Sequence, residues 1–170
     1  NKEAEMNILK ARNKLEEYVK QASASETKVN IITTIDHNPA SGIARISREI
    51  IANIIVLGWP QRSGLFDKLI GEKMDSILTN YDKTTFICNL EKPLVLHKRI
   101  VIAAPPLTEH EYGFDLWLSK IAKLAQELSI PILLYSNENT EKAVQKFFKK
   151  AKITVSFKAN PFTDWEDFLV

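Results

Sequence analysis

The sequence has little cysteine and no long apolar run. Its 170 residues include one cysteine, Cys88, so no disulfide can form within the chain. That cysteine content is typical of a reducing compartment. No apolar stretch approaches the roughly 20 residues that span a bilayer. A nucleophilic cysteine would need a cationic or helix-terminal neighbour, so we expect Cys88 to be a small buried strand residue.

The chain also has no marked excess of positive or negative charge. The formal net charge is only +2, and lysines alternate with glutamates along the chain. This balance predicts a mixed, solvated surface and no nucleic-acid partner. The 45% hydrophobic and 26% charged composition is that of a globular protein, and the length suits one ordinary domain with a sizeable core.

Helical and strand-like patterns alternate along the chain. Apolar residues at helical spacing mark most of the helices, and short β-branched runs mark the strands. Asn38 and Pro39 are typical of a helix cap and first turn. The alternation predicts an α/β fold with a parallel sheet and right-handed crossovers. Expected helices cover 3–21, 39–51, 65–80, 114–128 and 139–150, with a last one opening at 160–162, and expected strands cover 29–35, 53–57, 84–90, 99–104, 131–135 and 152–157.

One strand leads into a loop of the kind that holds phosphate. The apolar strand ends at Gly58, a polar loop with Arg62, Ser63 and Gly64 follows, and a helix is expected from about Leu65. Loop N–H groups and a helix N-terminus direct partial positive charge at an anion. The candidate binding residues are Gly58, Arg62, Ser63, Gly64, Gly71 and Glu72.

Two passages of the chain look alike. Residues 29–35 lead to Asn38-Pro39, and residues 152–157 lead to Asn160-Pro161, each with an expected helix before and after. An Asn-Pro pair alone is common after a strand. The repeated order of helix, strand, Asn-Pro and helix indicates an internal repeat.

The loop resembles the phosphate loop of the universal stress protein superfamily. That pattern is glycine, two residues, glycine, nine residues, glycine, then serine or threonine. Gly58 and Gly71 occupy the first and third glycine positions, whereas Gln61 stands at the second and Glu72 replaces the hydroxyl residue. The resemblance implies a parallel, three-layer α/β sandwich made of two partial copies. Residues 1–92 resemble the second half of one copy and residues 93–170 the first half of another.

The two half-copies are expected to pack as one compact unit. We expect their strands to share one sheet, because unpaired parallel strands would leave costly edges.

The departures from the family pattern bear on ligand binding. Glu72 places a carboxylate at the phosphate end of the loop, where it repels an anion, and Arg62 offsets only part of that charge. The family's acidic residue on the adenine side follows the first strand, and Pro105 stands at that place here. We therefore expect no cofactor, with ATP, AMP or a cyclic dinucleotide as the alternative.

No residue pattern indicates catalysis or a metal site. Ser63 has no evident base, and Gln61 two residues earlier rules out a Gly-x-Ser-x-Gly elbow. His110 stands between two glutamates, but no second histidine lies at helical spacing and no cysteine is near. We expect a protein that is not an enzyme and holds no metal.

The overall pattern resembles the tandem stress-protein-like C-terminal region of bacterial cation/proton (sodium/hydrogen) antiporters. The resemblance implies a regulatory or assembly domain on the cytoplasmic side of the inner membrane. It also implies a membrane antiporter domain preceding Asn1 in the same parent chain, and a homodimer formed through strand 84–90. The alternatives are a nucleotide-binding stress sensor and a tandem stress protein, neither attached to a transporter.

Overall fold

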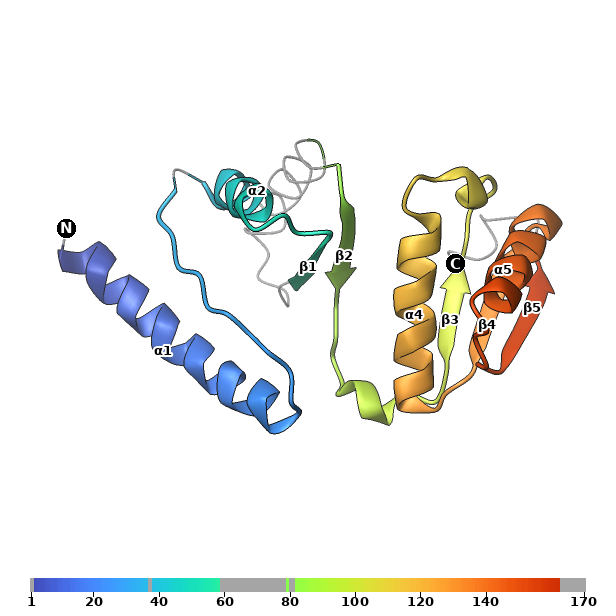
Figure 1. Ribbon diagram of the computed structural model, residues 1–170, viewed down its shortest axis with the longest axis horizontal. Coiled ribbons are helices and arrows are strands. Elements are labelled where there is room, and N and C mark those ends of the chain that lie inside the picture. The colour runs from blue at the N-terminus through green and yellow to red at the C-terminus, as the bar shows by residue number, and fades with distance from the viewer. Residues whose placement is uncertain (1, 37, 59–78, 80–81, 163–170) are drawn as a thin grey trace. The chain divides into compact units, whose positions relative to one another are not determined.

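The computed structural model describes residues 2–36, 38–58, 79 and 82–162, which fall into two compact units (Figure 1). Unit 1 comprises Asn1–Ala52 with Gly64–Tyr81, and unit 2 comprises Asn53–Ser63 with Asp82–Val170. The described helices are α1 (Lys2–Ala24), α2 (Pro39–Glu49), α4 (Phe114–Leu128) and α5 (Glu138–Lys150), with short 3₁₀ turns η1 (Leu94–Leu96) and η2 (Thr108–His110). The described strands are β1 (Ile54–Gly58), β2 (Thr84–Cys88), β3 (Ile100–Ala103), β4 (Ile132–Ser136) and β5 (Phe157–Pro161).

Unit 2 contains all five described strands, and every pairing between them is parallel. Strands β3, β4 and β5 form one sheet with β4 in the centre, and β1 pairs with β2 in another. In the larger sheet Ile102 lies opposite Leu134, which lies opposite Ala159. The predicted α/β class with parallel strands is therefore confirmed.

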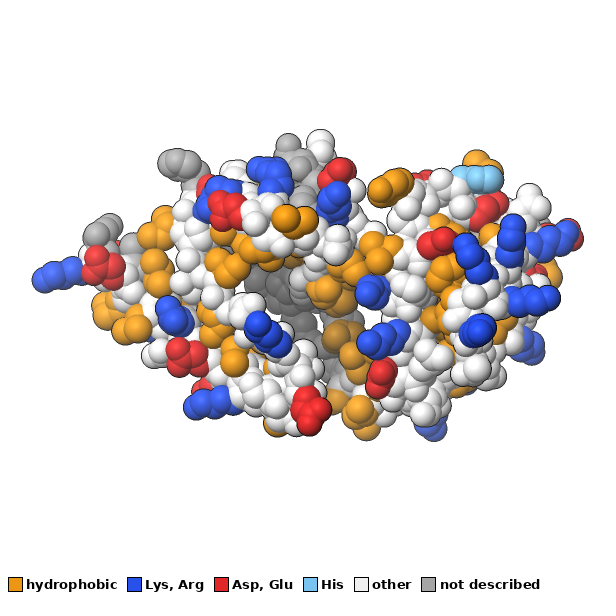
Figure 2. All heavy atoms as spheres, in the orientation of Figure 1, with side chains coloured by type: hydrophobic (Ala, Val, Ile, Leu, Met, Phe, Trp, Pro, Cys, Tyr) orange, Lys and Arg blue, Asp and Glu red, His pale blue; other side chains and the backbone are white. Residues whose placement is uncertain are grey.

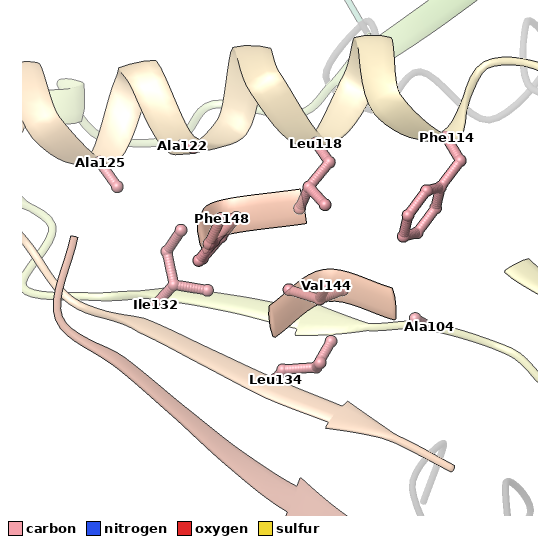
Figure 3. Close-up of a cluster of buried hydrophobic side chains, with 9 residues drawn as sticks. All are labelled: Ala104, Phe114, Leu118, Ala122, Ala125, Ile132, Leu134, Val144 and Phe148. Carbon is pink, nitrogen blue, oxygen red and sulfur yellow. The ribbon is translucent and has the colours of Figure 1, made fainter. Parts of the chain in front are cut away.

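Helices α4 and α5 pack on the same face of the three-stranded sheet, as expected of two successive right-handed crossovers. Leu118 of α4, Leu134 of β4 and Val144 of α5 are each 0% exposed and meet between these layers (Figure 3). Parallel strands bury long apolar side chains in this way. The complete buried cluster is Ala104, Phe114, Leu118, Ala122, Ala125, Ile132, Leu134, Val144 and Phe148.

Local sequence accounts for the ends of these helices. Asn137 caps α5, since its Oδ1 accepts a hydrogen bond from the Thr140 N–H at 2.9 Å. Lysines in the last turn of α5 place positive charge at the negative end of the helix dipole, which stabilises the helix. Helix α4 spans Phe114–Leu128 as predicted, and it ends where Ser129 takes a left-handed conformation.

Unit 1 contains a long exposed helix and a short capped one. Helix α1 has 23 residues, and the predicted helix over 3–21 is confirmed. Asn38 caps α2 as predicted, because its Oδ1 accepts a 2.8 Å hydrogen bond from the Ser41 N–H, and Pro39 opens the helix. The predicted helix over 39–51 ends early, at Glu49, since Ile51 adopts a left-handed φ of 53°.

Residues 29–35 are not a strand, so that prediction was wrong. They have no regular secondary structure, and Ile32 and Ile35 are exposed. A strand needs a neighbour to bond its backbone groups, and no described strand pairs with this segment. High β propensity alone did not produce a strand here.

The last strand was placed too early in the prediction. The sequence favoured 152–157, whereas β5 spans Phe157–Pro161, because Lys152 adopts a left-handed φ of 52° after α5. Asn160 and Pro161 are thus part of an edge strand, where proline is tolerated. The helix expected after them falls on residues 163–170, outside the described part of the chain.

The described strands form two sheets, where the prediction favoured one. Each sheet joins strands that are consecutive among those described, β1 with β2 and then β3 through β5. A single sheet would need β1 or β2 to pair with one of the strands β3 to β5. Residues 89–99, which connect the two sheets, are exposed throughout. The predicted helix at 65–80 lies almost wholly outside the described residues.

Candidate functional site

Only one of the predicted loop residues lies in the described part of the chain. Gly58 ends β1 and pairs with Cys88 of β2. No described heavy atom lies within 4 Å of the position that a Cβ at Gly58 would take. The other loop candidates, Arg62, Ser63, Gly64, Gly71 and Glu72, fall outside the described residues, so the phosphate loop remains a prediction.

The carboxyl edge of the three-stranded sheet is the described place where an α/β fold would bind a ligand. Ligands of open parallel sheets sit beyond the carboxyl ends of the strands. Here β3 is followed by Ala104, β4 ends at Ser136, and β5 ends at Pro161. The N-terminus of α5 also faces this edge, because α5 follows β4 after a single residue, Asn137.

A carboxylate of the chain itself is held at this edge. The Thr140 hydroxyl donates a 2.6 Å hydrogen bond to Glu109 Oε2, and the two residues are 31 positions apart. Thr140 is fully buried, and the Glu109 side chain is only 10% exposed. The Thr140 hydrogen bond lowers the pKa of Glu109 against the opposing effect of burial. Glu109 is therefore ionised at the start of α5.

The connection after β3 holds Glu109 in this place. Leu107 adopts a left-handed φ of 70°, and η2 follows it directly. The Thr108 hydroxyl donates a 2.6 Å hydrogen bond to the carbonyl of Pro105. His110 is mostly exposed and lies 3.7 Å from the other Glu109 oxygen. These contacts turn the carboxylate inward, toward the first turn of α5.

The Glu109 carboxylate lies where a bound anion would lie, at the N-terminus of α5. The first turn of a helix presents unpaired N–H groups and partial positive charge. Asn137 takes one of these N–H groups, and the Glu109 carboxylate supplies negative charge beside them. An incoming phosphate would meet this charge at close range, so the edge disfavours anionic ligands.

The residue after β5 makes further contacts at the same edge. The Phe162 N–H donates a 3.0 Å hydrogen bond to the Ser136 carbonyl. The Phe162 ring meets Tyr135 edge-on, with ring centroids 6.3 Å apart. The fully buried Ser136 hydroxyl is satisfied by the Asn137 carbonyl at 3.1 Å. The polar groups of Ser136, Asn137, Thr140 and Glu109 at this edge thus bond residues of the edge itself.

Sequence reasoning missed the Glu109–Thr140 pair. The prediction singled out the Glu109-His110-Glu111 run only as a weak metal candidate. Thr140 lies within α5, where its local pattern signals nothing beyond helix capping. A pair separated by 31 residues leaves no periodic trace, and only the packing of η2 on α5 reveals it.

The described residues include no group of three or more histidine, cysteine or acidic side chains that could hold a metal ion. Cys88 lies in a strand as predicted, but it is half-buried rather than buried.

A cavity of about 710 Å³ lies elsewhere in unit 2, at the amino ends of β1 and β2 and the start of α4. Gly113 is required there, because a Cβ would sit 2.8 Å from the Thr84 hydroxyl. The lining carries both lysines and carboxylates, so it selects no single sign of ligand charge. The lining residues include Asp82, Lys83, Glu111, Asp115, Trp117 and Lys120.

An ion-pair cluster in unit 1 fixes the turn before α2. Arg45 donates hydrogen bonds to Asp36, Glu49 and the Thr34 hydroxyl. Gly42 leaves room for Asp36, whose Cβ would lie 3.2 Å from a Cβ at that position. These contacts tie residues 34–36 to α2.

Comparison with known protein families finds no matching family, and a search of curated proteins finds no matching sequence. Among the described residues, no helix combines the length and apolar character needed to cross a membrane.

Proposed function

We propose that this chain is a regulatory or assembly domain of a bacterial sodium/hydrogen (cation/proton) antiporter, related to universal stress proteins and working through protein contacts. The observation that carries the proposal is the Glu109 carboxylate at the start of α5. Glu72, which lies outside the described residues, is expected to add a second carboxylate at the phosphate end of the loop. A domain of this kind is not an enzyme and needs no bound cofactor.

The parallel α/β architecture supports the resemblance on which the proposal rests. Strands β3 to β5 with α4 and α5 follow the order expected of the first half of a stress-protein-like copy. Strands β1 and β2 follow the order expected of the late strands of another copy. We propose that each of the two sheets belongs to a three-layer sandwich of this kind, on the cytoplasmic side of the inner membrane.

The proposed homodimer would form through β2. This strand bonds only β1 among the described strands, so none of them occupies its other edge. An unpaired strand edge is a template for another strand. Two copies related by a two-fold axis would join their β2 strands antiparallel and extend both sheets.

The parent sequence gives the most direct test of the antiporter assignment. The coding sequence upstream of Asn1 should encode several apolar segments of about 20 residues, with lysine and arginine enriched in the cytoplasmic loops. An upstream region without such segments would overturn the antiporter assignment and favour a free stress protein.

Calorimetry tests the proposed loss of nucleotide binding. The native chain should give no heat of binding with ATP, AMP or a cyclic dinucleotide. Glu72→Ser, which restores the family's hydroxyl residue, should gain measurable binding because a repulsive charge is replaced by a donor. Glu17→Ser on the exposed face of α1 removes the same charge elsewhere and should gain nothing.

The alternative function is a nucleotide-binding stress sensor with no transporter attached. Micromolar binding of ATP, AMP or a cyclic dinucleotide by the native chain would favour it. In that case Gly58, Arg62 and Gly71 would form the binding loop, and Arg62→Ala should weaken binding by about tenfold, as expected for a lost charge-assisted hydrogen bond.

A further inference from the structure

The connection between β2 and β3 carries aliphatic side chains into solvent. Every residue from 89 to 99 is exposed. Val95 is 75% exposed and Leu96 is 64% exposed. Single apolar residues on a surface are ordinary, but a group of them marks an interaction site. The exposed aliphatic residues of this connection are Leu90, Leu94, Val95 and Leu96.

This connection has a defined shape at its centre. Pro93 opens the turn η1, the Leu96 N–H donates to the Pro93 carbonyl at 3.0 Å, and the His97 N–H donates to the Leu94 carbonyl at 3.1 Å. In Figure 1 the yellow-green turn lies at the lower end of unit 2, just before β3. Apolar side chains reach the surface in that region of Figure 2.

Basic residues gather at the same edge of the three-stranded sheet. The starts of β3, β4 and β5 lie side by side, because Ile100 N–H bonds to the Pro131 carbonyl and Ile132 N–H to the Ser156 carbonyl. Helix α5 ends at this edge, since its last residues immediately precede the path into β5. The basic edge, as we define it, consists of Lys98, Arg99, Lys149, Lys150 and Lys152.

The cations of the basic edge are not neutralised by the described part of the chain. All five are exposed, and none forms an ion pair with a described residue. The nearby acidic residues in sequence and topology are Glu91 in the connection and Glu127 in the last turn of α4. The edge therefore keeps a net positive charge, although the whole chain is nearly neutral.

We propose that η1 and the basic edge together dock on an anionic lipid bilayer. The aliphatic side chains of Leu94, Val95 and Leu96 enter the boundary between head groups and acyl chains, and the lysines and arginine contact lipid phosphates. Peripheral proteins combine these two terms, apolar burial and attraction to anionic lipid. Cations alone would suit nucleic acid equally well, but nucleic acid offers exposed aliphatic side chains no apolar phase.

The surface lies outside the proposed nucleotide loop and the carboxyl edge of the sheet. Exposure, charge and topology within unit 2 support the docking independently of the antiporter assignment. A failed vesicle experiment would leave that assignment to be decided by the upstream sequence.

Vesicle sedimentation of the full 170-residue chain tests the docking. Vesicles with equal parts of phosphatidylcholine and phosphatidylglycerol should bind the chain, whereas phosphatidylcholine alone should bind it weakly. Each charge removed from the edge in Lys98→Gln and Arg99→Gln should lower the partition constant by about fivefold. Val95→Ser with Leu96→Ser should lower it by at least about tenfold, because several buried methylene-sized groups are lost.

Matched variants separate a specific surface from overall charge. Lys10→Gln with Lys14→Gln on α1 removes two exposed charges elsewhere and should leave vesicle binding unchanged. All replaced residues are exposed, so circular dichroism melting curves should coincide with that of the native chain. In a Cys88→Ser background, the polarity-sensitive fluorophore NBD on Val95→Cys should brighten and shift to the blue when anionic vesicles are added.

Four results would overturn the proposal. These are absence of sedimentation with anionic vesicles, an equal loss of binding in the α1 control, vesicle binding with no change in the NBD emission, and tighter binding to duplex DNA than to vesicles at the same salt concentration. The last result would assign the basic edge to nucleic acid. A dimer that dissociates in Val95→Ser with Leu96→Ser, without vesicle binding, would assign η1 to contact between copies.

Discussion

The three-stranded sheet of unit 2 and the first 36 residues of unit 1 differ in what holds them together. In the sheet, strands and helices from separate parts of the chain bury a common core around Leu118, Leu134 and Val144. In the first 36 residues, α1 is exposed along most of its length and residues 29–35 lack regular structure. Both regions carry clear sequence patterns, so pattern strength does not explain the difference.

The comparison separates helices from strands. A helix satisfies its backbone hydrogen bonds within its own segment, so α1 forms although Leu15 and Tyr18 remain exposed. A strand has no such internal partners. Residues 29–35 are richer in β-branched residues than β4, but only β4 lies between two bonded neighbours.

Truncating a core side chain should cause the largest loss of unfolding free energy. Leu134→Ala opens a cavity in a site that is 0% exposed, so it should cost about 2–5 kcal/mol of unfolding free energy. Leu15→Ala in α1, which is 38% exposed, should cost less than about 1 kcal/mol. Urea denaturation followed by circular dichroism measures both. Equal losses would mean that α1 is packed as tightly as the sheet.

The buried carboxylate should give the next largest effect. Thr140→Val removes the hydroxyl that bonds Glu109, leaving an ionised and mostly buried group without that partner, and should cost about 1.5–3 kcal/mol at neutral pH. Thr140→Ser keeps a hydroxyl and should restore most of the stability. Loss of stability in both variants would show that the methyl contact, and not the hydrogen bond, matters.

The same pair should make the stability of unit 2 depend on pH. The pKa of Glu109 is lowered in the folded chain, so its contribution is present above the unfolded value of about 4.3 and is lost as pH falls through the folded value. Native protein should therefore lose more stability on acidification than Glu109→Gln does. Glu111→Gln, an exposed neighbour, should follow the native curve; if it follows Glu109→Gln instead, the pair is not the source.

The two helix caps allow a smaller and more local comparison. Asn137→Ala and Asn38→Ala each remove a side-chain acceptor at a helix start and should cost about 1 kcal/mol. Hydrogen exchange with mass spectrometry should show faster exchange across unit 2 for Asn137→Ala, because α5 belongs to its core. For Asn38→Ala the faster exchange should be confined to α2; spread into α5 would contradict the division into two units.

The surface ion pairs of unit 1 should have the smallest effect. Arg45 contacts Asp36 and Glu49 at the surface, so Arg45→Ala should destabilise the chain less than any variant above, and less still in high salt. Arg48→Ala on the same helix gives the baseline, and denaturation at two salt concentrations measures both. A loss in Arg45→Ala that salt does not reduce would indicate packing rather than charge.

Local chemistry made much of unit 2 predictable. Helix α4 begins and ends where its apolar spacing places it, and α5 begins within one residue of its predicted start. In unit 1, Asn38 caps α2 as predicted. Errors arose where the outcome depended on a distant partner. Residues 29–35 were predicted as a strand, but no described strand pairs with them. Strand β5 begins five residues later than expected, after the left-handed Lys152, and there it pairs with β4.

The candidate sites divide in the same way. The motif from Gly58 to Glu72 is a sequence feature, and its residues beyond Gly58 lie outside the described part of the chain. The Glu109–Thr140 pair and the joining of η1 to Lys149, Lys150 and Lys152 were invisible in the sequence, because the first pair is 31 positions apart and η1 is more than 50 positions from those lysines. Neither feature has a spacing that a helix or strand period would reveal.

The α/β class, the described helices and the Asn38 cap followed from the sequence alone, because helices and caps depend on contacts within a few residues. Only tertiary contacts settled which β-prone segments became strands and how the strands divided into two sheets. They also settled that Glu109 lies at the start of α5. Strand pairing and carboxylate burial require groups far apart in the chain to meet, and the free energy of that meeting depends on the packed core rather than on local pattern.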